Sequence, residues 1–321
     1  MTSADRAAAH KLIIDTDPGI DDAMAIHYAC ADSRIELVGL TTIFGNVFIH
    51  QATRNALFLL EQAGYNADVA EGAEHPIIMT PNPPSHYVHG DEGLGDLSAP
   101  DVSEQADSRP AWTYISEMCR QFPGEIVLCP VGPLTNIARL LEHDPDIVSY
   151  VRKLVIMGGA VWVPGNVTDY AEANIWNDPH AADMVFAADW DIDLIGLDVT
   201  QKIACDAKDF DQIAEASPQI GGFLKQISEF YIRFYHSVLG REVCIMHDPS
   251  AVISVTDPEL FSYRKAEIEV MTDGDEIGRT RAVEGSGRRQ VNVAVDARCD
   301  DVRKRFLDIC AQADKMKTAR G

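Results

Sequence analysis

Residues 12–23 read Leu12-Ile13-Ile14-Asp15-Thr16-Asp17-Pro18-Gly19-Ile20-Asp21-Asp22-Ala23. A short apolar run ends in four aspartates, Asp15, Asp17, Asp21 and Asp22. Pro18-Gly19 interrupts the acidic segment, and the residues from Ala23 onward have a helical pattern. This order predicts a buried strand, a tight turn and the first turn of a helix.

The crowding of the four aspartates needs an explanation, because ionised carboxylates this close raise one another's pKa or need a cation between them. Asp21 and Asp22 have a simple alternative role, since acidic residues are favourable at a helix N-terminus. That role does not cover Asp15 and Asp17, which follow an apolar strand, where ligands of open α/β sheets often bind. We therefore favour a site for a hard cation, which prefers oxygen ligands, over helix capping alone.

The chain is strongly acidic. It has 321 residues, of which 46% are hydrophobic and 24% charged, and its formal net charge is -23. Nucleic-acid binding depends on neutralising phosphates with Lys and Arg, so this composition argues against a nucleic-acid partner and against a highly anionic substrate. A neutral small molecule or a cation fits better, although an acidic surface also favours solubility by itself.

The cysteines and the N-terminus indicate the compartment. Seven scattered cysteines without a CxxC pair are typical of a reducing environment rather than of a zinc site or a disulfide framework. Residues 1–10 contain no apolar segment typical of a signal peptide, and no apolar run has the length of a membrane span. We expect a cytoplasmic protein without a membrane partner.

Strand-like and helical segments alternate along the chain. We expect strands at 11–14, 35–43, 68–70, 125–130, 153–157, 192–197 and 290–295, and a hairpin from 267–271 and 278–284. We expect helices at 21–30, 50–63, 108–122, 137–143, 178–188, 206–216, 218–239 and 300–315. The order predicts an α/β fold: one open, mostly parallel, twisted sheet flanked by helices, with a small antiparallel hairpin extension. We expect a single domain over residues 1–321.

Two segments interrupt this alternation. Residues 80–100 read TPNPPSHYVHGDEGLGDLSAP and are rich in Pro, Gly and His. Loops this long inside a compact domain are usually functional or disordered, and we expect a mobile lid here. Residues 1–10 are expected to be flexible.

Familiar phosphate-binding motifs are absent from the sequence. Without GxGxxG or GxxxxGK[ST], a dinucleotide site or an NTP-hydrolase site loses its main support. Asp15-Thr16-Asp17 does match the DxD pattern of aspartate-nucleophile phosphatases. That chemistry leaves Asp21 and Asp22 unexplained, and it stands as the alternative enzyme class.

Three further polar groups follow predicted strands and could meet the aspartates at one edge of the sheet. They are Asn46; then Asn166, Glu172 and Asn174; and His247 with Asp248. Each residue alone has an ordinary structural explanation, as a turn residue, a helix cap or a buried histidine. Together they combine a cation site, amide and carboxylate groups suited to sugar hydroxyls, and one imidazole. That combination indicates chemistry on a neutral, polyol-like substrate.

The opening motif resembles the N-terminal signature of the calcium-dependent nucleoside hydrolases, the inosine–uridine preferring family. Further segments match in the family order, over roughly residues 11–300. These are Thr41-Thr42-Ile43-Phe44-Gly45-Asn46, His89-Gly90-Asp91-Glu92-Gly93-Leu94-Gly95, Val131-Gly132-Pro133-Leu134-Thr135-Asn136, Met157-Gly158-Gly159, Glu172-Ala173-Asn174-Ile175 and His247-Asp248. An ordered set of this kind is specific. It implies a Rossmann-like nucleoside hydrolase fold and hydrolysis of ribonucleosides to ribose and a free base.

The resemblance also implies a ligand set for one Ca²⁺ per subunit. Asp17, Asp22 and Asp248 would bind it through carboxylates and Val131 through its backbone carbonyl, an oxygen-only set that suits Ca²⁺. The ribose 2′- and 3′-hydroxyls and a water would complete the shell. Asp17 would act as the base for this Ca²⁺-bound water, the nucleophile, and Asp15 would support the site from nearby.

Roles for the remaining residues follow from the resemblance in the same way. Breaking the ribosyl C–N bond builds positive charge on the sugar, as in other glycoside hydrolysis. The ribose would be held by Asp21, Asn46, Asn166, Glu172 and Asn174. His247 would protonate the leaving base, with Tyr235 nearby and His89 closing over the base from the lid.

Two departures from the family pattern bear on specificity. Ala173 stands where a bulkier apolar residue is expected, and position 247 is His rather than the Cys of one branch. We expect a broad or pyrimidine-tolerant specificity, and a homodimer or homotetramer as in relatives. A homologue that binds Ca²⁺ and ribose without turnover is the non-enzymatic alternative, and Ala173 is its sequence support.

Overall fold

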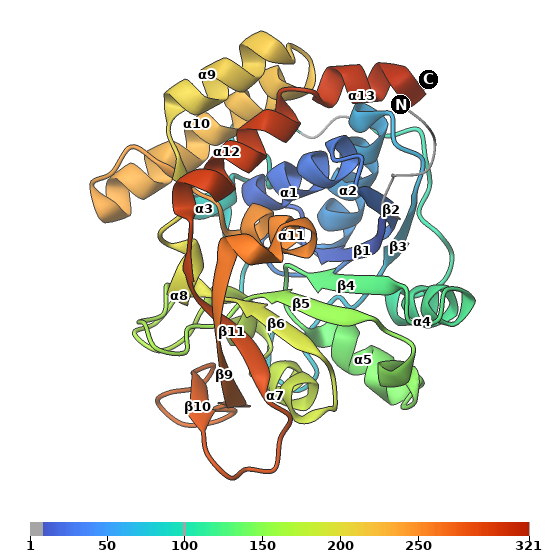
Figure 1. The fold of residues 1–321 in the computed structure, drawn as a ribbon, viewed down its shortest axis with the longest axis vertical. Helices are drawn as coiled ribbons and strands as arrows, with labels where there is room; N and C mark the ends of the chain where they lie inside the picture. Colours follow the sequence, from blue (N-terminus) through green and yellow to red (C-terminus); the bar gives the residue numbers. More distant parts are fainter. Residues whose placement is uncertain (1–8, 99–100, 321) are drawn as a thin grey trace.

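The computed structural model describes residues 9–98 and 101–320, so most of the N-terminal segment expected to be flexible lies outside it. Nine strands form one sheet in the order β10-β9-β11-β6-β5-β4-β1-β2-β3 (Figure 1). The strands are β1 His10–Thr16, β2 Ile35–Thr42, β3 Asp68–Glu71, β4 Ile126–Pro130, β5 Lys153–Met157, β6 Ile192–Ile195, β9 Phe261–Val270, β10 Thr280–Val283 and β11 Val291–Ala297.

The sheet is parallel from β3 through β11, and β9 and β10 extend it as an antiparallel hairpin. This confirms the expected fold class. β1 lies between β2 and β4, and the chain order of the strands reverses direction at β1 and β4. In open parallel sheets, such a reversal leaves a crevice at the carboxyl ends of the strands. The acidic motif therefore leaves β1 at the position where a ligand site is expected.

Helices cover both faces of the sheet (Figure 1). On one face lie α1 Ile20–Ala31, α2 Ile49–Ala63, α9 Ala207–Ala216, α10 Ile220–Leu239, α11 His247–Thr256, α12 Cys299–Cys310 and α13 Ala313–Arg320. On the other lie α4 Ala111–Gln121, α5 Thr135–His143 and α7 Pro179–Ala187. The short helices are α3 His86–His89, α6 Ala173–Asn177, α8 Leu197–Thr200, η1 Ile147–Ser149 and η2 Pro258–Leu260.

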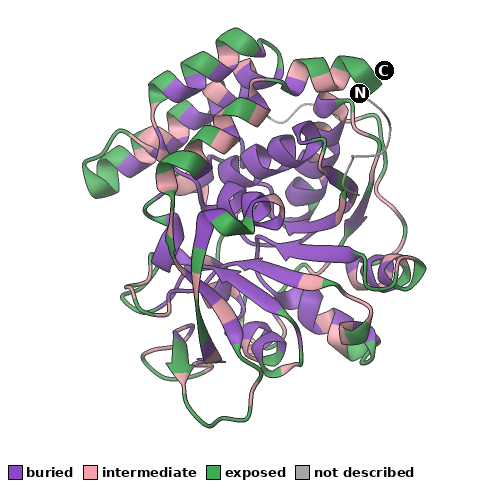
Figure 2. Ribbon diagram, viewed as in Figure 1, coloured by how far each residue is buried: buried purple, intermediate pink, exposed green. Residues whose placement is uncertain are grey.

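The strand sequences explain the three layers. Leu12 and Ile14 of β1 pack into the apolar core beneath α1, and Ile13 between them packs into the core beneath α4 and α5. Successive side chains of a strand point to opposite faces, so a continuous apolar run is buried from both sides. Figure 2 shows the central strands and α1 as buried.

Two predicted boundaries were wrong. The helix expected at 300–315 is two helices, α12 and α13, because Asp314 accepts hydrogen bonds from the backbone N–H groups of Gln219 and Ile220 and so caps α10. β9 begins at Phe261 rather than 267, because its charged residues face solvent while its backbone pairs with β11.

A two-stranded antiparallel pair, β7 Ala204–Cys205 with β8 Cys244–Ile245, lies outside the main sheet and carries no clear sequence signal. Among the helices of the described residues, none is both long enough and apolar enough to cross a membrane.

Candidate active site

A cavity of about 630 Å³ opens at the carboxyl ends of the parallel strands. It collects residues from distant parts of the chain, including almost every polar residue singled out from the sequence. Those that line it are Asp21, Asn46, His89, Val131, Asn166, Glu172, Asn174, Tyr235, His247 and Asp248. Asp15, Asp17 and Asp22 are buried and are not part of the lining.

Asp15 is the last acidic residue within β1 and is held by two side chains. Thr41 Oγ1 donates to its Oδ1 at 2.5 Å, and Asn136 Nδ2 donates to the same oxygen at 2.7 Å. Its Oδ2 has no partner within the described residues. Burial raises the pKa of Asp15 to about 7, and the two hydrogen bonds only partly oppose this.

Asp17 follows β1 and is enclosed by two glycine-containing turns. The backbone N–H of Asn46 donates to its Oδ2 at 2.6 Å, while its Oδ1 has no partner within the described residues. A side chain at Gly45 would collide with Oδ2, and a Cβ at Gly132 would lie 2.6 Å from Oδ1. The space around this carboxylate thus depends on glycine, and one of its oxygens remains available.

Asp22, the third residue of α1, is fixed from both sides. Thr16 Oγ1 donates to its Oδ1 at 2.5 Å, and the N–H of Gly19 donates to its Oδ2 at 3.0 Å. Asp22 therefore does cap the helix, as the simpler reading proposed. Oxygens of Asp21, Asp22 and Asp248 nevertheless lie within 4.8 Å of one another, as a group that could hold a metal ion.

This cluster differs in one member from the expected ligand set. Asp21 belongs to it, although we assigned Asp21 to the ribose, and Asp17 does not. Asp17 is still close enough for the charges of Asp22 and Asp21 to raise its pKa, after burial, which is the larger cause. The backbone N–H of Asp17 also donates to Asp22 Oδ1 at 3.2 Å, so Asp17 adjoins the cluster that contains Asp22 and Asp248.

The electrostatics of the cluster are unbalanced. Burial, followed by the Asp22 charge, raises the pKa of Asp21 to about 8, and burial with the neighbouring carboxylates raises the pKa of Asp248 well above its usual range. In the part of the chain that the structure describes, none of these carboxylates forms an ion pair with Lys or Arg; their one basic contact is His89 Nδ1, 3.9 Å from Asp21 Oδ1. A divalent cation would supply the missing charge.

The donor set fits a hard cation because it consists of oxygens. Asn174 Nδ2 donates to the Val131 carbonyl at 2.8 Å, and a carbonyl oxygen has a second lone pair to offer. Glu172 caps α6: its carboxylate accepts N–H groups of Gly159, Asn174 and Ile175. Asn166 lies on the exposed rim and accepts the N–H of Ala173, the first residue of α6.

An aromatic wall on α10 faces these carboxylates. Tyr231 donates its hydroxyl proton to Asp21 Oδ2 at 3.2 Å, and Tyr235 donates to the Tyr231 oxygen at 3.3 Å. His247 Nε2 lies 2.8 Å from the Tyr235 hydroxyl, and His247 Nδ1 lies 2.8 Å from Thr200 Oγ1. Burial lowers the pKa of His247 to about 4.

His89 is anchored rather than exposed. The backbone N–H of Ile20, the first residue of α1, donates to its Nδ1 at 3.1 Å, and burial lowers its pKa to about 3. His89 ends α3 inside the segment expected to form a lid, and Tyr87 two residues earlier is 71% exposed. The segment thus contains an exposed residue, Tyr87, and a buried one, His89. That it moves as a lid stays a prediction.

Sequence reasoning missed Thr200 and Tyr231. Tyr231 shares a helix face with Tyr235, because the two are four residues apart on α10. That spacing could have identified it once Tyr235 was singled out. Thr200 stands alone in a four-residue helix, and no sequence signal connects it to His247.

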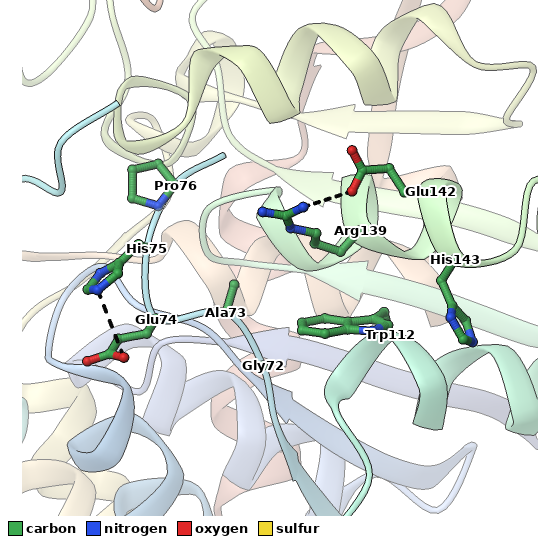
Figure 3. Close-up of a pocket in the computed structure, with 9 residues that line it drawn as sticks. All are labelled: Gly72, Ala73, Glu74, His75, Pro76, Trp112, Arg139, Glu142 and His143. Atoms are coloured by element: carbon green, nitrogen blue, oxygen red, sulfur yellow. Dashed lines mark hydrogen bonds and ion pairs between the residues drawn. The ribbon is translucent and has the colours of Figure 1, made fainter. Parts of the chain in front are cut away.

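A second hollow of about 590 Å³ lies outside this site, between the loop after β3, α4 and α5 (Figure 3). Its lining includes Trp112; Arg139 pairs with Glu142, and His75 Nε2 lies 3.9 Å from Glu74 Oε2. It shares no residue with the acidic cavity.

Comparisons with known proteins agree with this geometry. The family model "Inosine-uridine preferring nucleoside hydrolase" matches residues 12–307. Uridine nucleosidase 1 of Arabidopsis thaliana is 39% identical over 279 residues, covering 87% of this chain and 83% of the relative. The inosine-uridine preferring nucleoside hydrolase of Leishmania major is 34% identical, covering 82% of this chain and 84% of the relative.

Solved structures give the same result. A plant nucleoside hydrolase, the PpNRh1 enzyme, superposes with a TM-score of 0.91 at 34% identity, covering 94% of this chain and 99% of that one. A purine-preferring ribonucleoside hydrolase from Gardnerella vaginalis reaches 0.91 at 33% identity, covering 95% and 99%. With an acidic, oxygen-lined cavity at the switch point of a parallel sheet, the chain belongs to the inosine-uridine preferring nucleoside hydrolase family and hydrolyses ribonucleosides to ribose and a free base.

Proposed function

We propose that the acidic cavity holds one Ca²⁺ per subunit, bound by Asp17, Asp22 and Asp248 and by the Val131 carbonyl, as the family resemblance implies. The observation that carries this proposal is the unpartnered Oδ1 of buried Asp17, beside carboxylates with no Lys or Arg ion-pair partner within the described residues. When bound, a divalent cation supplies charge that holds the ribose hydroxyls and acidifies water. The same carboxylates would repel a phosphate group, which disfavours the phosphatase alternative.

Asp17 is the proposed base. Its Oδ1 accepts no hydrogen bond within the described residues, so it is free to take a proton from the water that attacks C1′ of the ribose. The Asn46 N–H on Oδ2 fixes the direction of the carboxylate. Asp15 supports the same end of β1 through Thr41 and Asn136.

The ribose is held where positive charge develops during bond cleavage. Asp21 belongs to both the metal-sized cluster and the cavity lining, so it can face the ribose hydroxyls from beside the ion. Asn46, Asn166, Glu172 and Asn174 provide further polar groups around the sugar. Because Glu172 already accepts three backbone N–H groups, we assign it mainly to orienting Asn174.

The leaving base is placed against His247, Tyr235 and His89. His247 is the proposed acid, and Tyr235 lies within hydrogen-bond reach of its Nε2. His89 accepts the Ile20 N–H at Nδ1, so its neutral ring carries the proton on Nε2 and acts as a donor. The 80–100 segment around it is proposed to cover the bound base.

We infer that the enzyme accepts both uridine and inosine, because relatives named for uridine and for both nucleosides match over most of the chain. We further propose that it forms a homodimer or homotetramer, as the family resemblance implies, and that it acts in the cytoplasm as a single domain over residues 1–321.

The test is release of free base from inosine and uridine by the purified protein, with and without a chelator and with Ca²⁺ restored. We expect activity to be lost with chelator and regained with Ca²⁺. Asp17→Ala should abolish turnover and Ca²⁺ binding in a folded chain, whereas Asp209→Asn, which alters a buried aspartate paired with Arg303, should keep both. Turnover by Asp17→Ala would remove it as the base, and binding without base release would favour the non-catalytic homologue.

A further inference from the structure

Asn55, on α2, has a fully buried side chain that contacts two parts of the site without lining the cavity. Its Nδ2 donates to the Pro18 carbonyl at 3.1 Å, in the turn of the acidic motif, and to the Glu92 carbonyl at 2.7 Å, in the segment after His89. A side-chain amide carries two N–H donors, so each carbonyl receives one. We propose that Asn55 is a positioning residue that holds this turn against residues 89–95 and thereby keeps the carboxylates and His89 at a fixed separation; this rests on their proposed roles in binding Ca²⁺ and the leaving base.

The turn at Pro18 is tied to the carboxylates on either side of it. The N–H of Gly19 donates to Asp22 Oδ2 at 3.0 Å, and the N–H of Asp17 donates to Asp22 Oδ1 at 3.2 Å. A Cβ at Gly19 would lie 2.6 Å from His89 Nδ1, so the turn packs directly against the imidazole. A shift of the Pro18 carbonyl would therefore move both carboxylates and the surface on which the imidazole rests.

Residues 89–95 have the close fit that this link requires. Gly93 has a φ of +81°, and a Cβ there would lie 2.7 Å from the Pro18 carbonyl oxygen and 3.1 Å from Asn55 Nδ2. Glycine adopts positive φ without steric cost and leaves this space open, so the backbone can approach the amide. Leu94 is fully buried and packs into the core beneath α1. The segment is therefore seated by an apolar contact on one side and by the Asn55 amide on the other.

The neighbouring contacts of α2 provide a matched control, because they reach the Glu92 side chain and not the turn. Arg54 pairs with the Glu92 carboxylate at 2.5 Å, and Gln51 Nε2 donates to the same carboxylate at 2.9 Å. The side chains of Arg54 and Glu92 are 30% and 36% exposed, and ion pairs of this kind contribute little. Glu92→Gln removes the ion pair but keeps the backbone carbonyl to which Asn55 donates.

The test measures Ca²⁺ affinity by competition with a fluorescent chelator in Asn55→Leu, Asn55→Ala, Glu92→Gln and the wild type. Leu keeps most of the volume without a donor, and Ala is the strongest helix former, so the pair guards against a variant that does not fold. An unmet buried carbonyl changes an equilibrium constant by a factor of about 10. We expect both Asn55 variants to raise the Kd for Ca²⁺ and the KM for inosine at least ~10-fold, and Glu92→Gln to change each less than ~3-fold.

A merely structural role is separated by a variant that loses stability elsewhere. Asp257→Asn breaks buried ion pairs with Arg34 and Arg305, so it should lower Tm and leave the Kd for Ca²⁺ unchanged. If the Asn55 variants likewise lower Tm but keep the wild-type Kd, Asn55 only stabilises the fold and the proposal is overturned.

Amide hydrogen exchange tests the link itself. Coupling between two sites is reciprocal, so Ca²⁺ should slow exchange in residues 89–95 of the wild type, including the Gly95 N–H that donates to the His89 carbonyl at 2.8 Å. This protection should be lost in Asn55→Ala, and equal protection in the two proteins would overturn the proposal. If the wild type binds no Ca²⁺, the proposed cation site fails instead, and faster exchange of residues 89–95 in ion-free Asn55→Ala than in ion-free wild type then decides whether Asn55 holds the segment.

Discussion

Adding Ca²⁺ to the ion-free enzyme should raise its thermal stability, and the size of the effect follows from the chain length. A ligand at 100 times its Kd stabilises the folded state by about 2.7 kcal/mol. At ~2.1 cal/mol/K per residue, unfolding 321 residues has an entropy of about 0.7 kcal/mol/K. The expected increase in Tm is therefore ~4 °C.

The increase should depend on pH. Burial raises the pKa of Asp15 to about 7 and that of Asp21 to about 8 in the ion-free protein, while unfolded aspartates titrate near about 4. Between these values the folded state binds more protons than the unfolded state, so ion-free stability falls as the pH rises. A bound cation offsets the negative charge of these buried carboxylates, so the Ca²⁺-induced increase in Tm should be larger at pH 8 than at pH 6.

Differential scanning fluorimetry with Ca²⁺ titrated into chelator-treated protein measures both effects. Asp248→Asn should abolish the shift. Asp209→Asn should lower Tm but keep the shift, because its partner Arg303 lies away from the cavity. A shift of equal size in Asp248→Asn and the wild type, or one that shrinks with rising pH, would refute this account of the cluster.

Two further substitutions probe the frame around the site. Thr280→Val leaves the buried N–H of Ala160 without its acceptor, so we expect a loss of ~1–3 kcal/mol in unfolding free energy and a higher KM for inosine, both restored by Thr280→Ser. Asp257→Asn breaks pairs with Arg34 and Arg305 and should cost ~1–3 kcal/mol at pH 7 by urea unfolding. Burial alone would raise the pKa of Asp257, but hydrogen bonds and the arginine charges lower it; its contribution is present above about pH 4 and is lost below, so the two curves should converge in acid. A difference in unfolding free energy between the wild type and Asp257→Asn that stays constant at all pH values would contradict the expectation for Asp257.

The sheet was predictable because its strands carry their own signal. In runs such as 125–130 and 153–157 every position after the first is apolar, as expected for strands buried on both faces, and the runs matched β4 and β5 closely. The short helices were not predictable in this way. α6 begins where the Glu172 carboxylate accepts three backbone N–H groups, and this cap depends on the folded loop rather than on a local sequence pattern.

The site was predictable to the extent that its residues are chemically unusual. Four aspartates in one short motif are conspicuous in any sequence, and all four are found buried around one cavity edge. The sequence alone did not show which of these aspartates cluster, since the group that could hold a metal ion contains Asp21 and not Asp17. Thr200 could not be predicted, because a single threonine carries no sequence signal and its contact with His247 arises only from the tertiary fold.

The carboxylate cluster joins the first long helix of the chain to α11, which packs against it. During synthesis on the ribosome, Asp17, Asp21 and Asp22 emerge early and wait without Asp248. A nascent or truncated chain that stops before α11 therefore lacks both Asp248 and His247. On the proposed roles of these two residues, we expect such a fragment to release no free base.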